Sequence, residues 1–152
     1  MPSTIVILNG PNLNMLGVRE PEIYGTQTLE DIRKLCEECA TSISAKIDFR
    51  QSNHEGQLID WVHMAASTAN GVIINPGGYS HSSVSLMDAL LGINIPVIEV
   101  HLSNIYKRER FRHHSYISRA SVGVIAGFGS YGYLLALYGI NDQIKKLPAK
   151  AA

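Results

Sequence analysis

The chain has 152 residues, a hydrophobic content of 45% and a charged content of 17%, which exclude a disordered chain and allow one sizeable core. Its 13 basic and 13 acidic side chains balance, which argues against general binding to nucleic acid or to a membrane surface. No apolar run approaches the ~20 residues of a membrane span, and the opening residues lack the basic stretch of a signal peptide. We therefore expect one domain over residues 1–152, located in the cytoplasm.

Five apolar, β-branched runs alternate with segments of helical spacing along the chain. Runs such as GVIIN and VGVIA are apolar on both sides, which is typical of parallel strands covered on both faces. The predicted strands are Thr4–Asn9, Lys46–Gln51, Gly71–Asn75, Pro96–His101 and Ser121–Ala126.

Predicted helices lie between these strands. Thr28, followed three residues later by Asp31, resembles a capping box and marks the start of the first helix. The predicted helices are about Thr28–Ser44, Glu55–Ala69, Ser82–Leu91 and Tyr131–Lys146, and the crossover Ser103–Arg119 is expected to be irregular and basic. This alternation predicts an α/β fold with a right-handed, doubly wound parallel sheet, for which the flavodoxin-like strand order 2-1-3-4-5 is the natural arrangement.

Polar side chains follow the first predicted strand, at the edge where such sheets bind ligands. The segment Asn9–Gly25, NGPNLNMLGVREPEIYG, is long for a connection between a strand and a helix, and it has no periodic apolar face. Within it, Arg19 and Tyr24 form a pairing that could make the tyrosine phenol acidic enough to act as a base.

The third and fourth predicted strands also end in polar residues. Asn75 precedes Pro-Gly-Gly, where it either shapes the turn or faces a ligand. Glu99 and His101 are two residues apart, so both side chains can reach one pocket. A lone histidine is more often structural, but a carboxylate in an apolar strand is costly to bury without a partner, which favours a functional pair.

Two other kinds of site are less well supported. Cys36 and Cys39 have a redox or zinc spacing, but they lie inside a predicted helix without a second ligand pair, so packing on one helix face is favoured. A metal site from His81, Glu99 and His101 is conceivable, although no local metal-binding signature accompanies it.

The fourth crossover concentrates basic residues between positions 106 and 114, YKRERFRHH. It could be a solvated face, a subunit interface or a site for a carboxylate or polyol substrate, whereas one interleaved aromatic gives little support for nucleic acid. None of the six lysines falls at the carboxyl end of a predicted strand, which disfavours Schiff-base chemistry. The chain has no GxxxxGK[ST] phosphate loop, and GxGxxG is absent from the turn after the first predicted strand.

Taken together, these segments closely resemble the type II 3-dehydroquinate dehydratases from Ile5 to about Leu137. The landmarks are NGPNLNMLG with REPEIYG, NPGGYSHSSVSLMDAL, EVHLSNI, FRHHSYIS and GVIAGFGSYGYLLAL. One departure is Met87, where members of the family often carry Arg just before the acid that is Asp88 here. The departure leaves the chemistry untouched but affects any ion pair that this Arg would make between subunits.

The resemblance implies the reversible dehydration of 3-dehydroquinate to 3-dehydroshikimate by anti elimination through an enolate, without metal or cofactor. It implies that Tyr24 is the base that removes the proton next to the ketone and that His101 protonates the departing hydroxyl. Arg19 would stabilise the developing charge, while Asn12 and Glu99 would order a water molecule and orient His101.

The resemblance also implies a substrate-binding set and an assembly. That set is Asn75, His81, Leu102, Ser103, Arg112 and, from a neighbouring subunit, Asp88. Family membership implies a homododecamer built as a tetramer of trimers. The segment 17–25 looks like a lid whose closure places its polar residues and excludes water.

Two alternatives remain open at this point. The chain could be a flavodoxin-like binding module for a nucleotide or flavin, although the loop after the first strand does not look like a phosphate cradle. It could also be a non-catalytic relative that kept the fold as an assembly unit. If the chain is an enzyme, aromatic biosynthesis and quinate breakdown both use the same reaction.

Overall fold

A five-stranded parallel sheet forms the centre of the computed structural model, which describes residues 1–18 and 21–148, with the backbone alone for residues 23 and 24. The strand order is β2-β1-β3-β4-β5, and every neighbouring pair is parallel, which confirms the predicted topology. The strands are β1 (Ser3–Asn9), β2 (Ala45–Gln51), β3 (Gly71–Asn75), β4 (Val97–His101) and β5 (Gly123–Ala126).

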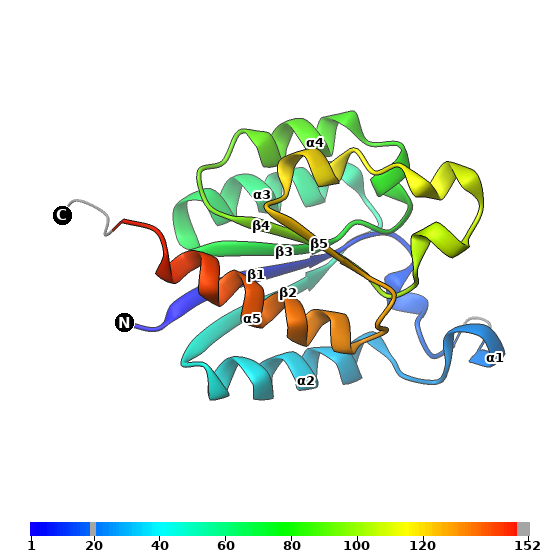
Figure 1. Ribbon diagram of the computed structural model, residues 1–152, viewed down its shortest axis with the longest axis horizontal. Helices are drawn as coiled ribbons and strands as arrows, with labels where there is room; N and C mark the ends of the chain where they lie inside the picture. The colour runs from blue at the N-terminus through cyan, green and yellow to red at the C-terminus, as the bar shows by residue number, and fades with distance from the viewer. Residues whose placement is uncertain (19–20, 149–152) are drawn as a thin grey trace.

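Helices cover both faces of this sheet (Figure 1). One face carries α2 and α5, and the other carries α3 and α4, so the sheet is the middle of three layers. The α-helices are α1 (Pro21–Tyr24), α2 (Leu29–Ser42), α3 (Glu55–Thr68), α4 (Val84–Leu91) and α5 (Tyr131–Lys145). A helix layer on each face explains why the inner strands β1 and β3 are apolar on both sides, whereas the edge strand β2 carries Lys46, Asp48 and Arg50.

Capping side chains account for most of the small differences from the predicted helix bounds. The Thr28 hydroxyl accepts a hydrogen bond from the Asp31 N–H, and the Asp31 carboxylate accepts one from the Thr28 N–H, so the predicted capping box is confirmed. The helix predicted from Ser82 begins at Val84 because the Ser83 side chain caps it. The first long helix ends before Ser44, whose φ of +57° is incompatible with a right-handed helix.

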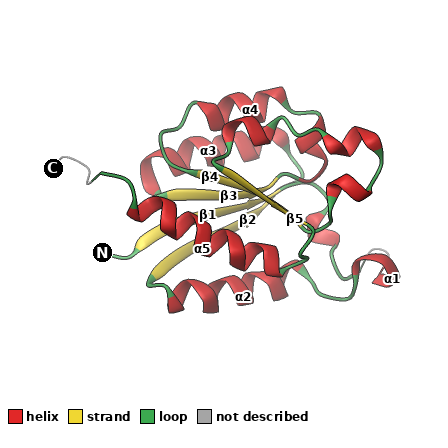
Figure 2. Cartoon of the chain, viewed as in Figure 1, coloured by secondary structure: helices red, strands yellow, loops and turns green. Residues whose placement is uncertain are grey.

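The connections contain short helical turns that a periodicity argument cannot detect. The crossover 103–119 is irregular, as predicted, and consists of three 3-10 turns joined by loops (Figure 2). The segment after β1, which has no periodic apolar face, contains one 3-10 turn and the four-residue α1, each too short to show such a face. The 3-10 turns are η1 (Leu13–Met15), η2 (Gly77–His81), η3 (Ile105–Lys107), η4 (Arg110–His113) and η5 (Ile117–Ala120).

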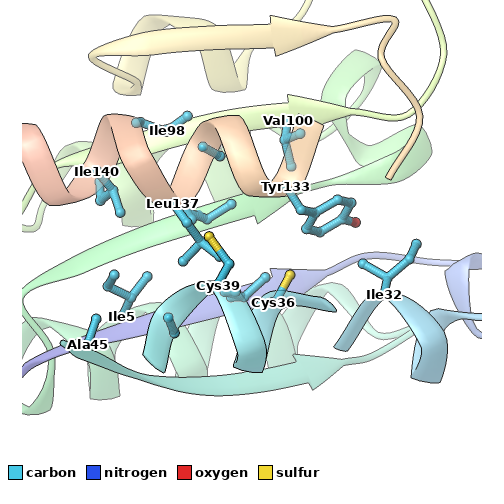
Figure 3. Packing of buried hydrophobic residues seen from close by; sticks show 14 residues of the cluster. Ile5, Ile32, Cys36, Cys39, Ala45, Ile98, Val100, Tyr133, Leu137 and Ile140 are labelled. Carbon is cyan, nitrogen blue, oxygen red and sulfur yellow. The ribbon is translucent and has the colours of Figure 1, made fainter. Parts of the chain in front are cut away.

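The two cysteines pack in the core between α2 and α5, among apolar side chains (Figure 3). Both are free thiols, and burial raises the pKa of Cys36 to about 12. This confirms that the pair occupies one buried helix face, and a thiol with so high a pKa is a poor nucleophile at neutral pH. Among the described helices, none has the length and apolar character needed to cross a membrane.

Gly10 joins the end of β1 to the turn that follows β3. Its N–H donates to the Asn75 carbonyl oxygen over 2.8 Å. A Cβ atom at Gly10 would lie 2.3 Å from the carbonyl oxygen of Pro76, closer than any stable contact. The close approach of these two backbones therefore requires glycine at this position, and it holds two strand ends together at one edge of the sheet.

We predict that Gly10→Ala lowers the free energy of unfolding by about 1–3 kcal/mol, because the added methyl group forces the two backbones apart. The matched control is Gly56→Ala in α3, where a Cβ atom meets nothing within 4 Å. Chemical denaturation of both variants measures the difference. The control should be neutral or slightly stabilising, and equal stability of Gly10→Ala and the wild type would contradict the close contact.

Candidate active site

A pocket of about 290 Å³ opens at the carboxyl ends of β1, β3 and β4. The segment after β1 contributes Pro11, Asn12, Leu13, Met15 and Leu16, and the turn after β3 contributes Asn75, Gly77, Gly78 and His81. The end of β4 and the crossover contribute His101, Leu102, Ser103, Ile105, Arg108 and Arg112. The size suits a small molecule, and the position is the strand edge that the topology predicted.

The pocket brings together most of the residues singled out in the sequence. The predicted site residues that line it are Asn12, Asn75, His81, His101, Leu102, Ser103 and Arg112. Glu99 lies behind His101 and does not line the pocket, and Asp88 lies away from it in α4. Arg19 lies outside the described residues, and of Tyr24 only the backbone, at the end of α1, is described.

His101 and Glu99 form a buried pair at the end of β4. Both side chains point to the same side of the strand, and the His101 Nε2 atom hydrogen-bonds the Glu99 carboxylate. The Ser118 hydroxyl donates to the second oxygen of that carboxylate, Oε1, over 2.6 Å. With Nε2 engaged by Glu99, Nδ1 is the ring nitrogen left for a ligand in the pocket.

Two opposing effects act on the Glu99 carboxyl group, which has no exposed surface. Burial raises its pKa, whereas the hydrogen bonds from His101 and Ser118 lower it, and the net result is a pKa below the ordinary value. Glu99 is therefore ionised at neutral pH. An ionised carboxylate holds the imidazole ring in one orientation by accepting the Nε2 proton.

Asn75 is held at both ends of its side-chain amide. The Nδ2 group donates to the hydroxyl of Tyr133 over 2.9 Å, and Oδ1 accepts the N–H of Gly77 over 3.3 Å. An amide nitrogen carries two hydrogens, so one remains for the pocket that Asn75 lines. Across the pocket, Asn12 adopts a left-handed φ of +70°, and its N–H donates to the side chain of Asn53.

The pocket offers cationic and N–H donor groups together. Arg108 and Arg112 line it, and within the described chain its lining includes no aspartate, glutamate or lysine. In that same part of the chain, no hydrogen bond engages the backbone N–H groups of Leu102 and Ser103. Two adjacent N–H donors beside arginine side chains suit a carboxylate ligand.

His81 and Arg112 are each oriented by a partner on the crossover. The His81 Nδ1 atom donates to the carbonyl oxygen of His114 over 2.8 Å, which leaves Nε2 for the pocket. The Arg112 Nε atom donates to Glu109 over 2.8 Å, and its guanidinium lies 5.0 Å from the Phe111 ring centroid. Both side chains are thus positioned before any ligand arrives.

Sequence reasoning missed three side chains at this site. Arg108 was noted only as part of a basic run, whereas it lines the pocket. Ser118 holds Glu99, and Tyr133 holds Asn75, from segments far along the chain. No local signal could have found these two, because a serine in a loop and a tyrosine in a helix look ordinary until the fold places them.

No group of three or more histidine, cysteine, aspartate or glutamate side chains in the described chain is arranged to hold a metal ion. The sequence suggested a metal site from His81, Glu99 and His101. These side chains do not form one, since the Glu99 carboxylate is hydrogen-bonded to His101 and Ser118. The arrangement instead provides a histidine with one available nitrogen, an amide donor and a place for an anion.

Comparisons with known proteins agree with this geometry. The family described as Dehydroquinase class II matches residues 3–141. The 3-dehydroquinate dehydratase 1 of Agrobacterium fabrum is 54% identical over 142 residues, covering 93% of this chain and 98% of that protein. The 3-dehydroquinate dehydratase 1 of Bradyrhizobium diazoefficiens is 58% identical over 146 residues, covering 95% of this chain and 94% of that protein.

The fold leads to the same group of proteins. The type II dehydroquinase structure from Propionibacterium acnes superposes with a TM-score of 0.89 at 44% sequence identity, covering 93% of this chain and 98% of that one. Sequence motifs, strand order and overall structure therefore agree, and the chain belongs to the class II dehydroquinase family.

Proposed function

We propose that this protein is a hydro-lyase that dehydrates 3-dehydroquinate to 3-dehydroshikimate, a step of the shikimate pathway. The observation that carries the proposal is the buried His101–Glu99 pair, in which His101 lines the same pocket as Asn75, Leu102 and Ser103. Relatives named 3-dehydroquinate dehydratase match more than nine-tenths of the chain. Quinate catabolism uses the same reaction, and we propose it as the second role open to the enzyme.

The reaction removes a proton next to a ketone and a hydroxyl from the adjacent carbon. We propose that the Tyr24 phenolate takes the proton, while the C–H electron pair moves toward the ketone oxygen and forms an enolate. A free tyrosine titrates near pH ~10, so the phenolate needs a neighbouring cation, and Arg19 is the proposed one. The sequence motif carries this assignment, because neither side chain is within the described part of the chain.

The enolate needs a hydrogen-bond donor at its oxygen. Asn75 keeps one N–H for the pocket while its other amide groups are engaged by Tyr133 and Gly77. We propose that this N–H, through a water molecule ordered with Asn12, stabilises the enolate oxygen. Donors that are held in place before the reaction cost little reorganisation when the charge develops.

His101 completes the elimination. The enolate re-forms the ketone, the carbon–oxygen bond breaks, and the leaving hydroxyl takes a proton from the His101 Nδ1 atom to depart as water. Glu99 and Ser118 orient the ring for this transfer. We propose that this acid and the Tyr24 base act on opposite faces of the ring, which would give anti elimination.

The rest of the substrate is held by groups around the rim. We propose that the N–H groups of Leu102 and Ser103 bind the carboxylate, and that His81 and Arg112 contact the ring hydroxyls. Asp88 does not line the pocket of its own chain, which agrees with a role at the pocket of a neighbouring subunit. We propose that the protein assembles as a homododecamer, a tetramer of trimers, in the cytoplasm.

We also propose that residues 17–25 close over the pocket within one domain that spans the chain. The two ends of this segment lie together, since a Cβ atom on Gly17 would lie 2.6 Å from the Thr26 carbonyl oxygen. Gly17 and Gly25 both have a φ of +81°, which favours glycine at both ends. A loop with close ends can move as a unit.

The purified protein should convert 3-dehydroquinate into a conjugated enone, which ultraviolet absorbance follows directly. After incubation with substrate and borohydride and removal of both, the protein should keep its activity toward fresh substrate, because no lysine lines the described pocket and no imine is expected. Loss of activity with borohydride would indicate a covalent imine. Absence of enone from a folded protein would overturn the enzymatic proposal and favour a binding module or a non-catalytic relative.

Tyr24→Phe should lower kcat by at least about 100-fold, because a general base contributes a factor of this order. KM should change by no more than about threefold, since the phenol makes its main contribution after the substrate binds. Tyr138→Phe, at an exposed position of α5, is the matched control and should keep normal turnover. A near-normal rate for Tyr24→Phe would remove this residue from the role of base.

Glu99→Gln tests the orienting carboxylate through stability as well as rate. The pKa of Glu99 in the folded protein is below the ordinary 4.5, so the unfolded chain binds more protons between the two values. The stabilisation from ionised Glu99 is therefore complete above about pH 4.5 and is lost as the pH falls through the lower folded value.

At pH about 7, Glu99→Gln should lower the free energy of unfolding by about 1–3 kcal/mol and kcat by at least about tenfold. Denaturation at pH about 7 and about 3 should show this stability difference shrinking in acid. Glu38→Gln, on an exposed face of α2, should change stability by less than about 0.5 kcal/mol at both values. A difference that grows in acid would contradict the assigned ionisation.

A further inference from the structure

The hydroxyl of Tyr133 is a buried polar group that touches no substrate in the mechanism above but hydrogen-bonds Asn75. Tyr133 lies in the first turn of α5, and its side chain is completely buried. Figure 3 shows its ring at one end of the core cluster, with the hydroxyl pointing away from Leu137. Burial raises the pKa of this phenol above its ordinary value, so the hydroxyl keeps its proton at neutral pH.

This hydroxyl connects the ends of two neighbouring strands. It donates to the Asn9 Oδ1 atom over 2.6 Å and accepts from the Asn75 Nδ2 atom over 2.9 Å. Asn9 and Asn75 are register partners at the ends of β1 and β3. The Asn9 amide is fixed in turn, because its Nδ2 group donates to the Arg50 carbonyl oxygen over 3.0 Å.

The direction of these hydrogen bonds determines which way the Asn75 amide faces. A tyrosine hydroxyl has one hydrogen, and here Asn9 accepts it. Only lone pairs remain for Asn75, which must therefore present its NH₂ group rather than its oxygen. The Gly77 N–H requires the same orientation of the Asn75 amide, because it donates to the Oδ1 atom. If the Asn75 amide were reversed, its oxygen would face the lone pairs of the Tyr133 hydroxyl, and its NH₂ group would face the Gly77 N–H.

We propose that Tyr133 is a positioning residue for catalysis, which together with Asn9 fixes the Asn75 amide so that its second N–H points toward the enolate oxygen. This inference rests on the dehydratase function proposed above. Tyr133 itself does not line the pocket, so it acts through Asn75 and touches no substrate. Loss of its hydroxyl would leave Asn75 in the pocket but free to rotate or reverse.

Tyr133→Phe is the variant that tests the inference, because it keeps the buried ring and removes only the hydroxyl. We expect kcat to fall about tenfold, less than the full loss of an oxyanion donor, with KM within about twofold of the wild type. Tyr138→Phe, in the same helix but exposed, is the control that should keep wild-type kcat. A purely structural role would lower the melting temperature of Tyr133→Phe without changing its kcat.

A double-mutant cycle with Asn75→Ala shows whether Tyr133 acts through Asn75. In the Asn75→Ala background, Tyr133→Phe should change kcat by less than about twofold, since the group that it positions is already absent. The same tenfold loss in both backgrounds would overturn the inference. If Tyr133→Phe does not fold, Asn9→Leu removes the acceptor of the tyrosine proton, and unchanged kcat in that variant would overturn the inference equally.

The wild-type assay separates the two proposals. Without enone formation by the wild type, the proposed function fails and the inference falls with it. If the wild type is active and Tyr133→Phe keeps normal kcat, the function stands and only the positioning role is wrong.

Discussion

A parallel sheet with helices on both faces leaves only its strand ends open to a ligand, and this constraint organises the whole molecule. β1, β3 and β4 are neighbours that run in the same direction, so their carboxyl ends meet at one edge. The residues that end them are Asn9, Asn75 and His101. Asn75 and His101, which are far apart in sequence, therefore line one pocket, while Asn9 lies beside Asn75 and is hydrogen-bonded within the core.

Polar side chains at the end of an apolar core need hydrogen-bond partners, and the hydrogen bonds that they form also orient the side chains of the site. Every buried side-chain nitrogen and oxygen in the described chain has a hydrogen-bond partner. One set of bonds runs from Ser118 to Glu99 and His101, and another links Asn9, Tyr133 and Asn75. Since unsatisfied buried groups cost about 1–3 kcal/mol each, the same contacts stabilise the fold and orient the groups that we propose to be catalytic.

The two halves of the proposed mechanism are built in different ways. The acid and the enolate donor stand at ends of core strands, where packing and paired hydrogen bonds restrict them. The base is assigned to the segment after β1, whose two ends are close together. Fixed groups at the strand ends, together with the closure proposed for residues 17–25, would suit a reaction that must admit a substrate and then exclude water.

Much of this protein was readable from its sequence. Apolar runs predicted the buried strands, because a covered parallel strand is apolar on both sides, and the alternation of strands with helices predicted the strand order. The two-residue spacing of Glu99 and His101 predicted a shared face, and ordered motifs identified the family. These features are local in sequence, so composition and periodicity record them.

Only the tertiary structure decided which distant side chains complete the site. Ser118 and Tyr133 hold Glu99 and Asn75 from segments 19 and 58 residues away along the chain. Their roles depend on hydrogen-bond direction and on burial, which arise when α5 and the crossover pack against the strand ends. A sequence specifies a donor and an acceptor, but folding determines that they meet, and in which orientation.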